Sequence, residues 1–131
     1  MAESDRTARA EALLDRIFTP AWRDHKGGVP WPSASGLDFA RLCVEHCYAD
    51  AWAREGRLDL RTRSLITLTV LASYGSSDEL KLHVQGALAL GHEPDDVVEL
   101  LIHLMPYIGV PRVVQAMRVA GQVLQQNAAP R

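Results

Sequence analysis

Hydrophobic residues recur along most of the chain at the three- and four-residue spacing of an amphipathic α-helix. The first such pattern places Leu13, Ile17 and Phe18 on one face and ends before Pro20. Valine, isoleucine and threonine cluster in the run LITLTVLAS, but no hairpin turn and no period-two alternation accompanies them. The pattern therefore predicts an all-α chain.

Capping and breaking residues divide this pattern into six predicted helices. Asp59 and Ser76 are candidate N-caps, Gly91 is a candidate C-terminal stop, and Pro106 is expected to kink or break a helix. The helix after Asp59 has almost no polar face beyond its first turn, so we expect it to be central and buried. The predicted helices cover residues 4–18, 37–54, 60–75, 77–90 and 94–105, and a sixth starts at residue 111.

Residues 19–36 interrupt the helical pattern. Their sequence, TPAWRDHKGGVPWPSASG, contains three prolines and three glycines, which excludes regular structure over much of it. Irregular loops of this length are uncommon in compact domains and often serve function. Two interpretations stay open: a substrate lid carrying Trp22 and Trp31, or a segment that only wraps the surface.

Composition limits the classes of protein to which the chain can belong. Its 131 residues fit one domain over residues 1–131, and 14 basic against 16 acidic residues leave a net charge of -2, which gives no indication of nucleic-acid binding. No apolar run reaches the roughly 18 residues of a membrane span, and the first residues lack the apolar core of a secretory signal. We expect a cytoplasmic protein with no membrane partner.

The two cysteines, Cys43 and Cys47, are four residues apart on a predicted helix. This spacing is poor geometry for a disulfide, so reduced thiols are expected. A zinc site with the neighbouring His46 is the less favoured alternative, because helical spacing turns that ring away from the two sulfurs. The favoured interpretation is a pair of small core residues.

Glu79 and His83 form the most informative pair in the sequence. Ser76 and Glu79 fit a capping box, which would explain the glutamate without any chemistry. Residues at i and i+4 also share a helix face, and a carboxylate beside a histidine raises its basicity and orients it for proton transfer. A capping pair with a well-packed histidine and an acid/base pair therefore both fit the residues.

Several motifs, in order, resemble the carboxymuconolactone decarboxylase family over about two thirds of the chain. RTRSLITL opens the central helix, DELKLHVQGAL supplies a Glu-x-x-x-His helix, ALGHEPDDVVELL gives a small-residue turn and an acidic helix start, and YIGVP gives a Tyr-x-Gly-x-Pro break. In the related thiol peroxidases two cysteines precede the helix histidine, whereas Ser76 and Glu79 stand at those places here. The resemblance is therefore to the decarboxylase branch.

The resemblance implies an alkylhydroperoxidase-like all-helical fold that assembles as a homotrimer or homohexamer. It also implies a lyase that needs no cofactor and no metal and that acts on a small carboxylated lactone or a related enolisable acid. His83 is then the first catalytic candidate, facing the oxyanion that develops when carbon dioxide leaves, and Glu79 or Asp50 supplies or relays the proton. Asp50 ends the triplet Tyr48-Ala49-Asp50, where the family has Trp-Gly followed by an acid.

Four further residues are candidates for substrate binding: Arg63, His103, Tyr107 and Trp52. Arg63 suits a substrate carboxylate as a bidentate donor, although a salt bridge to Asp59 or Glu99 explains it equally well. His103 stands where the family commonly has glutamine, and it fits either a pocket wall or a core histidine. Tyr107 is more simply explained by packing.

A second class of function stays open beside the decarboxylase. The altered segment 19–36 suits a tailoring isomerase, cyclase or dehydratase acting on a larger ring, or a binding oligomer without catalysis. Retention of Glu79, His83 and Asp50 favours an active enzyme.

Overall fold

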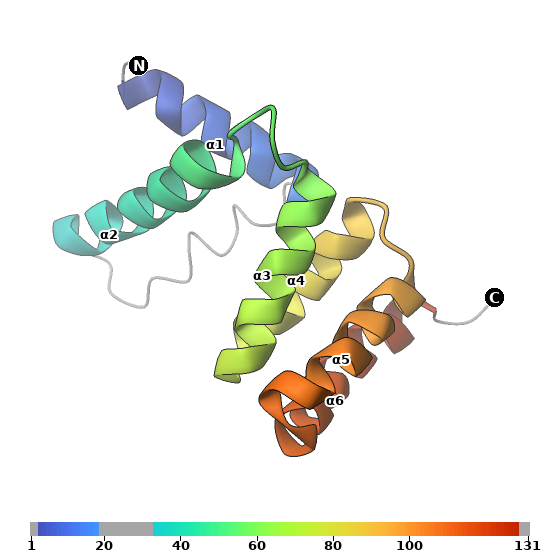
Figure 1. Ribbon diagram of the computed structural model, residues 1–131. Coiled ribbons are helices and arrows are strands. Elements are labelled where there is room, and N and C mark those ends of the chain that lie inside the picture. Colours follow the sequence, from blue (N-terminus) through green and yellow to red (C-terminus); the bar gives the residue numbers. More distant parts are fainter. Residues whose placement is uncertain (1–2, 19–32, 129–131) are drawn as a thin grey trace. The chain divides into compact units, whose positions relative to one another are not determined.

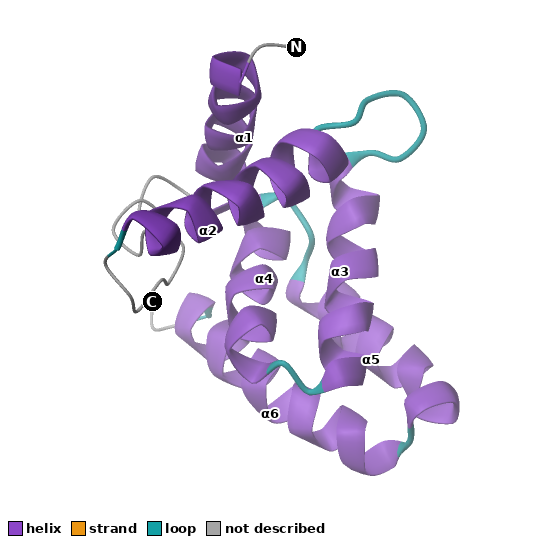
Figure 2. Cartoon of the chain, turned by 90° about the vertical axis from the view of Figure 1, so that its left-hand side faces the viewer, coloured by secondary structure: helices purple, strands orange, loops and turns teal. Residues whose placement is uncertain are grey.

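The computed structural model describes residues 3–18 and 33–128, and the chain divides into two compact units (Figure 1). The first unit is Met1–Asp59 and the second is Leu60–Arg131. Within the described ranges every regular element is helical, as the purple segments of Figure 2 show. The predicted all-α fold is confirmed, and a single domain over the whole length stays a prediction.

The first unit contains α1 (Glu3–Phe18), α2 (Ala34–Val44) and the π-helix η2 (Glu45–Trp52), which continues directly from α2. The N–H of Ala53 donates to the carbonyl of Tyr48 at 2.8 Å, the five-residue hydrogen bond that defines the wider π-helical turn. α1 packs against α2 and η2 through its apolar face. The buried residues of α1 are Ala10, Leu13, Leu14 and Ile17.

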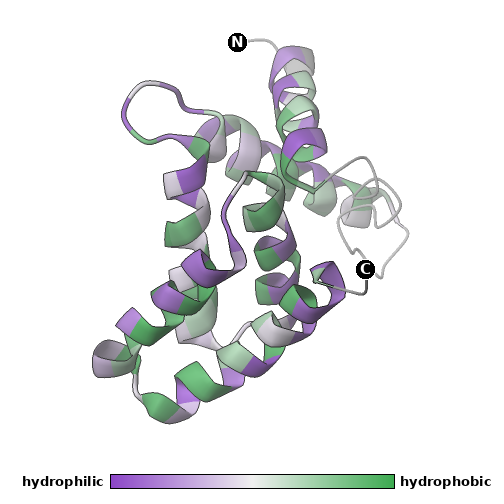
Figure 3. Ribbon diagram, turned by 90° about the vertical axis from the view of Figure 1, so that its right-hand side faces the viewer, coloured by the Kyte–Doolittle hydropathy of each residue, from purple (hydrophilic) through white to green (hydrophobic). Residues whose placement is uncertain are grey.

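The second unit is a bundle of α3 (Leu60–Tyr74), α4 (Ser77–Ala89), α5 (Pro94–Ile108) and α6 (Val110–Asn127). α3 packs against α4, α5 and α6, and α6 also packs against α4 and α5 (Figure 1). Hydrophobic and hydrophilic positions alternate along these helices, as the period of an amphipathic helix requires (Figure 3). The buried core comprises Leu68, Ala72, Leu80, Val84, Ala87, Val97, Leu101, Leu104, Val113, Ala116, Ala120 and Val123.

The second predicted helix differs from the structure at its start and in its type. The Ser33 hydroxyl accepts the N–H of Gly36 at 3.1 Å, so α2 begins at Ala34, inside the segment predicted to be irregular. Its last eight residues are π-helical, which no periodicity of the sequence indicated. Residues 19–32, and with them the predicted lid, lie outside the described residues.

α5 continues through Pro106 and ends at Ile108, so the predicted kink or break near residues 105–109 takes the form of a break at Gly109 rather than at the proline. A proline inside a helix removes the hydrogen bond to the carbonyl four residues earlier, here that of Ile102. Ile102 is exposed, so solvent can satisfy this carbonyl. The helix is capped by Gly109, whose φ of 90° is in the left-handed region that glycine tolerates.

Large apolar side chains stay exposed on both units. On α3 they form a stripe with four-residue spacing, Ile66, Val70 and Tyr74, which are 49%, 43% and 77% exposed. Further exposed apolar side chains lie on α2, α5 and α6, namely Leu37, Phe39, Leu42, Ile102, Met105, Tyr107, Val110 and Val114. α3 is thus central to its bundle, as predicted, but it is not buried all round.

Within the described ranges, no helix combines the length and the apolarity that crossing a bilayer demands.

Candidate functional site

His83 lies on α4, inside the core of the second unit. Its side chain is 6% exposed, and the neighbouring Leu80 and Val84 are buried core residues. Burial disfavours the charged imidazolium, and it lowers the pKa of His83 from 6.5 to about 4. The ring is therefore neutral at pH 7, with one nitrogen as a hydrogen-bond donor and the other as an acceptor or base.

The two ring nitrogens of His83 differ in their surroundings. Nδ1 is buried and has no hydrogen bond to the described residues, while the residue as a whole does interact with its surroundings. Buried polar groups normally have hydrogen-bond partners, and a catalytic role or a bound water is among the explanations of an exception. A neutral imidazole in this position is chemically suited to donate to, or accept from, a bound molecule.

Glu79 lies one turn earlier on α4 and is exposed. The predicted capping box is not formed, because the N–H of Ser76 donates to the carbonyl of Leu71 at 3.1 Å and so closes the preceding helix. The Ser76 hydroxyl also makes no capping hydrogen bond. The short connection between α3 and α4 commits Ser76 to the end of α3, which leaves Glu79 without a capping role.

The predicted coupling of Glu79 to His83 is also not seen. No hydrogen bond or ion pair joins the two side chains in the described ranges, and burial alone shifts the pKa of His83, downwards. A carboxylate in contact would shift the pKa upwards. One residue is at the surface of the helix and the other is in the core.

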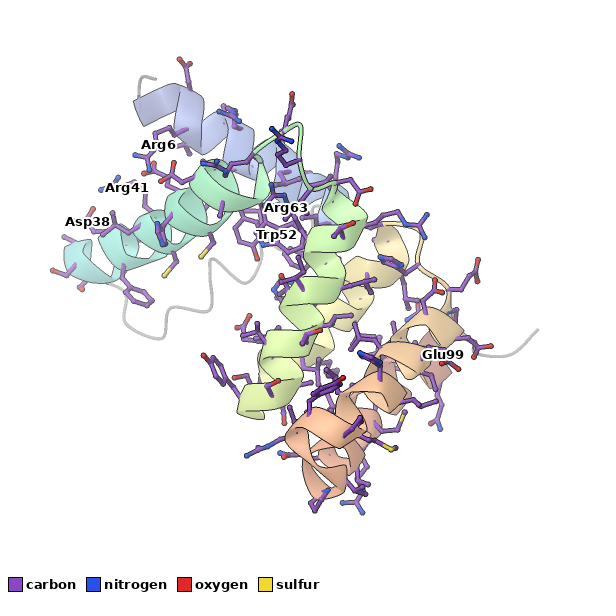
Figure 4. All side chains as sticks on the ribbon, viewed as in Figure 1. Arg6, Asp38, Arg41, Trp52, Arg63 and Glu99 are labelled. Carbon is purple, nitrogen blue, oxygen red and sulfur yellow. The ribbon has the colours of Figure 1, made fainter. Side chains whose placement is uncertain are left out.

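Arg63 lies in the first turn of α3 and is half-buried. Its carbonyl accepts the hydroxyl of Thr67 at 2.9 Å, and the residue has further interactions. Figure 4 shows Glu99 on α5, directed away from Arg63, and no ion pair joins the two in the described part of the chain. The predicted alternative of a salt bridge to Glu99 is therefore not formed.

His103 and Tyr107 lie together on the exposed face of α5. Their ring centroids are 5.5 Å apart, and Tyr107 is 73% exposed. Within this unit His103 is therefore not a core histidine and Tyr107 is not a packed core residue, because both rings are at the surface. Ile102 and Met105 are further exposed apolar residues of α5.

Asp50 lies on η2 in the first unit, and both of its carboxylate oxygens bind the guanidinium of Arg6 on α1. Nε of Arg6 donates to Oδ1 at 3.1 Å, and Nη2 donates to Oδ2 at 2.5 Å. This hydrogen-bonded pairing with Arg6 lowers the pKa of Asp50, and the charges of Arg6, His46 and Arg9 add to the effect. Asp50 is therefore held as a carboxylate, which makes it a poor first proton donor.

Glu45 is a buried carboxylate that the sequence did not single out. Its side chain accepts the hydroxyl of Thr7 at 2.7 Å and Nη1 of Arg41 at 3.2 Å, and Nη1 of Arg6 is 3.7 Å away. Arg6 and Arg41 approach it from α1 and α2 (Figure 4). A buried charge is tolerated when it is paired and hydrogen-bonded in this way. The four-residue spacing of Arg41 and Glu45 was the available sequence signal for this cluster.

Trp52 ends η2 and is buried within the first unit, at 8% exposure. Its ring stacks on that of Tyr48 at a centroid distance of 6.0 Å, and Tyr48 meets Phe18 edge-on. This aromatic cluster joins η2 to α1. Trp52 thus has a packing role, and substrate binding by Trp52 stays a prediction.

Cys43 and Cys47 are reduced and exposed, so the interpretation of them as core residues is wrong. The two lie where α2 passes into η2, outside the apolar interior of the unit. The described residues contain no cluster of three histidine, cysteine or acidic side chains that could hold a metal ion.

His92 was also missed, although it is buried in the turn between α4 and α5 at 8% exposure. Its Nε2 is 3.0 Å from the carbonyl oxygen of Arg61, and its Nδ1 is 3.6 Å from Oδ2 of Asp96. The only sequence signal was a histidine directly after a C-terminal glycine, which is too common to indicate a role.

The predicted site residues are thus divided between the two units. The second unit holds His83, Glu79, Arg63, His103 and Tyr107, and the first holds Asp50 and Trp52.

Comparison with known proteins assigns the family. Residues 38–122 match the carboxymuconolactone decarboxylase family. The chain belongs to this family. The matched range includes both η2 and the whole of α4, so it covers Asp50 as well as His83.

Two curated proteins are similar to this family member. The 4-carboxymuconolactone decarboxylase of Acinetobacter baylyi is 34% identical over 88 residues, which are 67% of this chain and 65% of that protein. The nitrosuccinic acid decarboxylase npaB of Metarhizium robertsii is 32% identical over 83 residues, 63% of this chain and 57% of that protein. The chain thus aligns with less than two thirds of the length of each relative.

Proposed function

We propose that this chain is a carbon–carbon lyase that removes carbon dioxide from a small carboxylated, enolisable acid without a cofactor. The observation that carries the proposal is the buried, neutral His83 on α4, within the range that matches the family. The names of the two relatives support decarboxylation as the reaction class.

The two relatives' names also support a common electronic requirement. A lactone carbonyl in conjugation, or a nitro group on the neighbouring carbon, can receive the electron pair of the carbon–carbon bond that breaks. Carbon dioxide leaves, the pair moves to an acceptor oxygen as a dienolate or nitronate, and a proton is then added to carbon. The protein must therefore stabilise an oxyanion and deliver one proton.

His83 is proposed as the oxyanion donor. A neutral imidazole N–H in a low-dielectric interior stabilises developing negative charge more strongly than the same donor does in water. The lowered pKa of His83 means that the ring keeps this neutral form over the whole neutral pH range. A protonated His83 is thereby disfavoured as the resting form.

The remaining roles follow from charge and exposure. Glu79, exposed on the same helix, is proposed to supply or relay the proton, and Arg63 to bind the substrate carboxylate. Asp50 is proposed to act as an ionised relay rather than as a first donor, because Arg6 binds both of its oxygens. Trp52, His103 and Tyr107 stay proposed substrate contacts.

A homotrimer or homohexamer in the cytoplasm is proposed as the working form. The exposed apolar stripe of α3 supports assembly, because contiguous apolar patches on one chain usually mark interaction surfaces.

The test is release of carbon dioxide by the purified chain from 4-carboxymuconolactone and, separately, from nitrosuccinate. His83→Gln should lower turnover by about 10²- to 10⁴-fold, since groups of this kind contribute that much to a rate. Lys81→Gln, which introduces the same residue at an exposed position of the same helix, is the matched control. Full activity in His83→Gln contradicts the proposed mechanism, and no turnover of either acid by the wild type favours the tailoring or binding alternatives.

A further inference from the structure

His92 contacts the first turn of α3 through one partly buried side-chain hydrogen bond. Its Nε2 is 3.0 Å from the carbonyl oxygen of Arg61, 31 residues earlier in the chain. A carbonyl only accepts, so Nε2 carries the hydrogen and donates it. The ring thereby joins the α4–α5 turn to the start of α3.

Other atoms of the same histidine lie at the ends of α4 and α5. Its backbone N–H donates to the carbonyl of Ala87 at 3.1 Å, at the end of α4. Its Nδ1 is 3.6 Å from Oδ2 of Asp96, and this oxygen also accepts the N–H of Glu93 at 2.8 Å at the start of α5. His92 therefore links the ends of three helices, and it is 8% exposed.

Arg63 follows Arg61 by two residues, so it belongs to the helical turn that His92 holds. The first turn of a helix is held weakly by the helix itself, because its N–H groups have no intrahelical acceptors. A side-chain hydrogen bond from outside the helix therefore helps to fix this turn. The position of the Arg63 guanidinium depends on where this turn lies.

We propose that His92 is a positioning residue for Arg63: it fixes the first turn of α3 so that the guanidinium meets the substrate carboxylate in a defined place. The inference rests on the proposed function of Arg63 as the carboxylate anchor. His92 itself touches no substrate, and its effect reaches the reaction through binding.

The kinetic test compares His92→Phe, which fills the space without a donor, with His92→Gln, whose amide keeps one. We expect His92→Phe to raise KM about 5- to 30-fold, as expected for the loss of one hydrogen bond made by a buried side chain, with little change in kcat. His92→Gln should recover most of the affinity. Val97→Ala, a buried change in the first turn of α5, controls for destabilisation alone and should leave KM unchanged.

A double-mutant cycle with Arg63→Met tests the route of the effect. If His92 acts through Arg63, His92→Phe adds little to KM once the guanidinium is gone. An equal rise in KM in both backgrounds overturns the inference. A decrease in kcat without a change in KM also overturns the inference. The same holds if KM rises in proportion to the loss of thermal stability in all variants.

Hydrogen exchange separates this inference from the proposed function. The amides of residues 64–67 donate to the carbonyls of the first turn of α3, so they report whether that turn is fixed. We expect His92→Phe to reduce their protection while the middle of α6 keeps its own. Unchanged protection overturns the inference even in an active enzyme, whereas reduced protection in a chain with no turnover upholds the link and contradicts only the proposed function.

Discussion

Glu79 and His83 are one helical turn apart on α4, yet Glu79 is exposed and His83 is 6% exposed in the core of the second unit. No hydrogen bond or ion pair joins them in the described ranges. The Glu79 carboxylate is accessible to solvent, whereas the neutral imidazole of His83 is shielded from solvent. This difference suits a proton carrier and an oxyanion donor better than it suits a coupled acid/base pair.

Replacement of Glu79 by glutamine is expected to leave stability unchanged. Glu79 is exposed and makes no capping bond, so the free energy of unfolding should change by less than about 0.5 kcal/mol. If Glu79 supplies the proton, turnover should fall about 10²-fold or more. Thermal unfolding and carbon dioxide release, each compared with Glu99→Gln on α5, check both halves. Unchanged turnover would exclude Glu79 as the proton donor.

The pH dependence of His83 follows from its burial. Its pKa is about 4 in the folded chain against 6.5 for a solvated histidine, so between these values the unfolded chain binds more protons than the folded one. The contribution of His83 to the free energy of unfolding is fully present above pH 6.5 and is lost as the pH falls towards 4. The loss amounts to about 3 kcal/mol for this residue.

Chemical denaturation at several pH values checks this prediction. The wild type should lose stability between pH 6.5 and 4 more steeply than His83→Gln does, which has no titrating group at that position. In kinetics, the acid limb that belongs to His83 should lie near pH 4. A His83 resonance that titrates near 6.5 in the folded protein would contradict both expectations.

The Arg6–Asp50 pair predicts a carboxylate that stays ionised to low pH. Arg6→Met removes the main cause of the lowered pKa, so the Asp50 carboxyl should titrate at a higher pH than in the wild type. Carboxyl NMR titration measures this change directly. Arg9→Met is the matched control, since Arg9 makes a smaller contribution to Asp50 and donates instead to the carbonyl of Ala53. Equal shifts in both variants would refute the role of Arg6.

Much of the fold was predictable because the sequence carries local signals for it. The periodicity of α1, the Pro94 start of α5 and the stop at Gly91, with its φ of 94°, are each set by residues within one or two turns. η2 was not predictable, because the α- and π-helical forms of residues 45–52 differ in hydrogen bonding and not in any residue pattern that marks one of them. No period in the sequence encodes that difference.

The candidate site was predictable only in part, for the same reason. The family motif marked His83, and its spacing from Glu79 suggested coupling, but four-residue spacing does not determine which residue faces the core. Ser76 looked like half of a capping box, yet its N–H serves the helix before it. Glu45 and His92 depend on partners 38 and 31 residues away, Thr7 and Arg61, and no local pattern reports such partners.

Assembly should depend on the stripe of α3. Val70 lies between Ile66 and Tyr74 and is 43% exposed in one chain, so a charge there would be placed within any interface built on the stripe. Val70→Asp should shift the mass measured by light scattering towards the monomer, whereas Gln122→Asp, at an exposed polar position of α6, should not. A wild type that is monomeric at micromolar concentration would contradict the predicted trimer or hexamer.

Replacement by alanine should change the free energy of unfolding in opposite directions at two glycines of the second unit. Gly75 follows α3 with a φ of 70°, and a Cβ there would also meet the guanidinium of Arg112, which can move aside. Backbone strain therefore dominates, and Gly75→Ala should lower the free energy of unfolding by about 1–2 kcal/mol.

Gly121 lies within α6 in ordinary helical conformation, and a Cβ there would meet nothing within 4 Å. Gly121→Ala should raise the free energy of unfolding by about 0.5–1 kcal/mol, because alanine loses less backbone entropy than glycine on entering a helix. Urea unfolding of the two variants beside the wild type checks the pair. If Gly121→Ala destabilises the protein, the surface of α6 at Gly121 is covered in the assembled protein. If Gly75→Ala leaves the free energy of unfolding unchanged, the turn between α3 and α4 can relax out of the left-handed region.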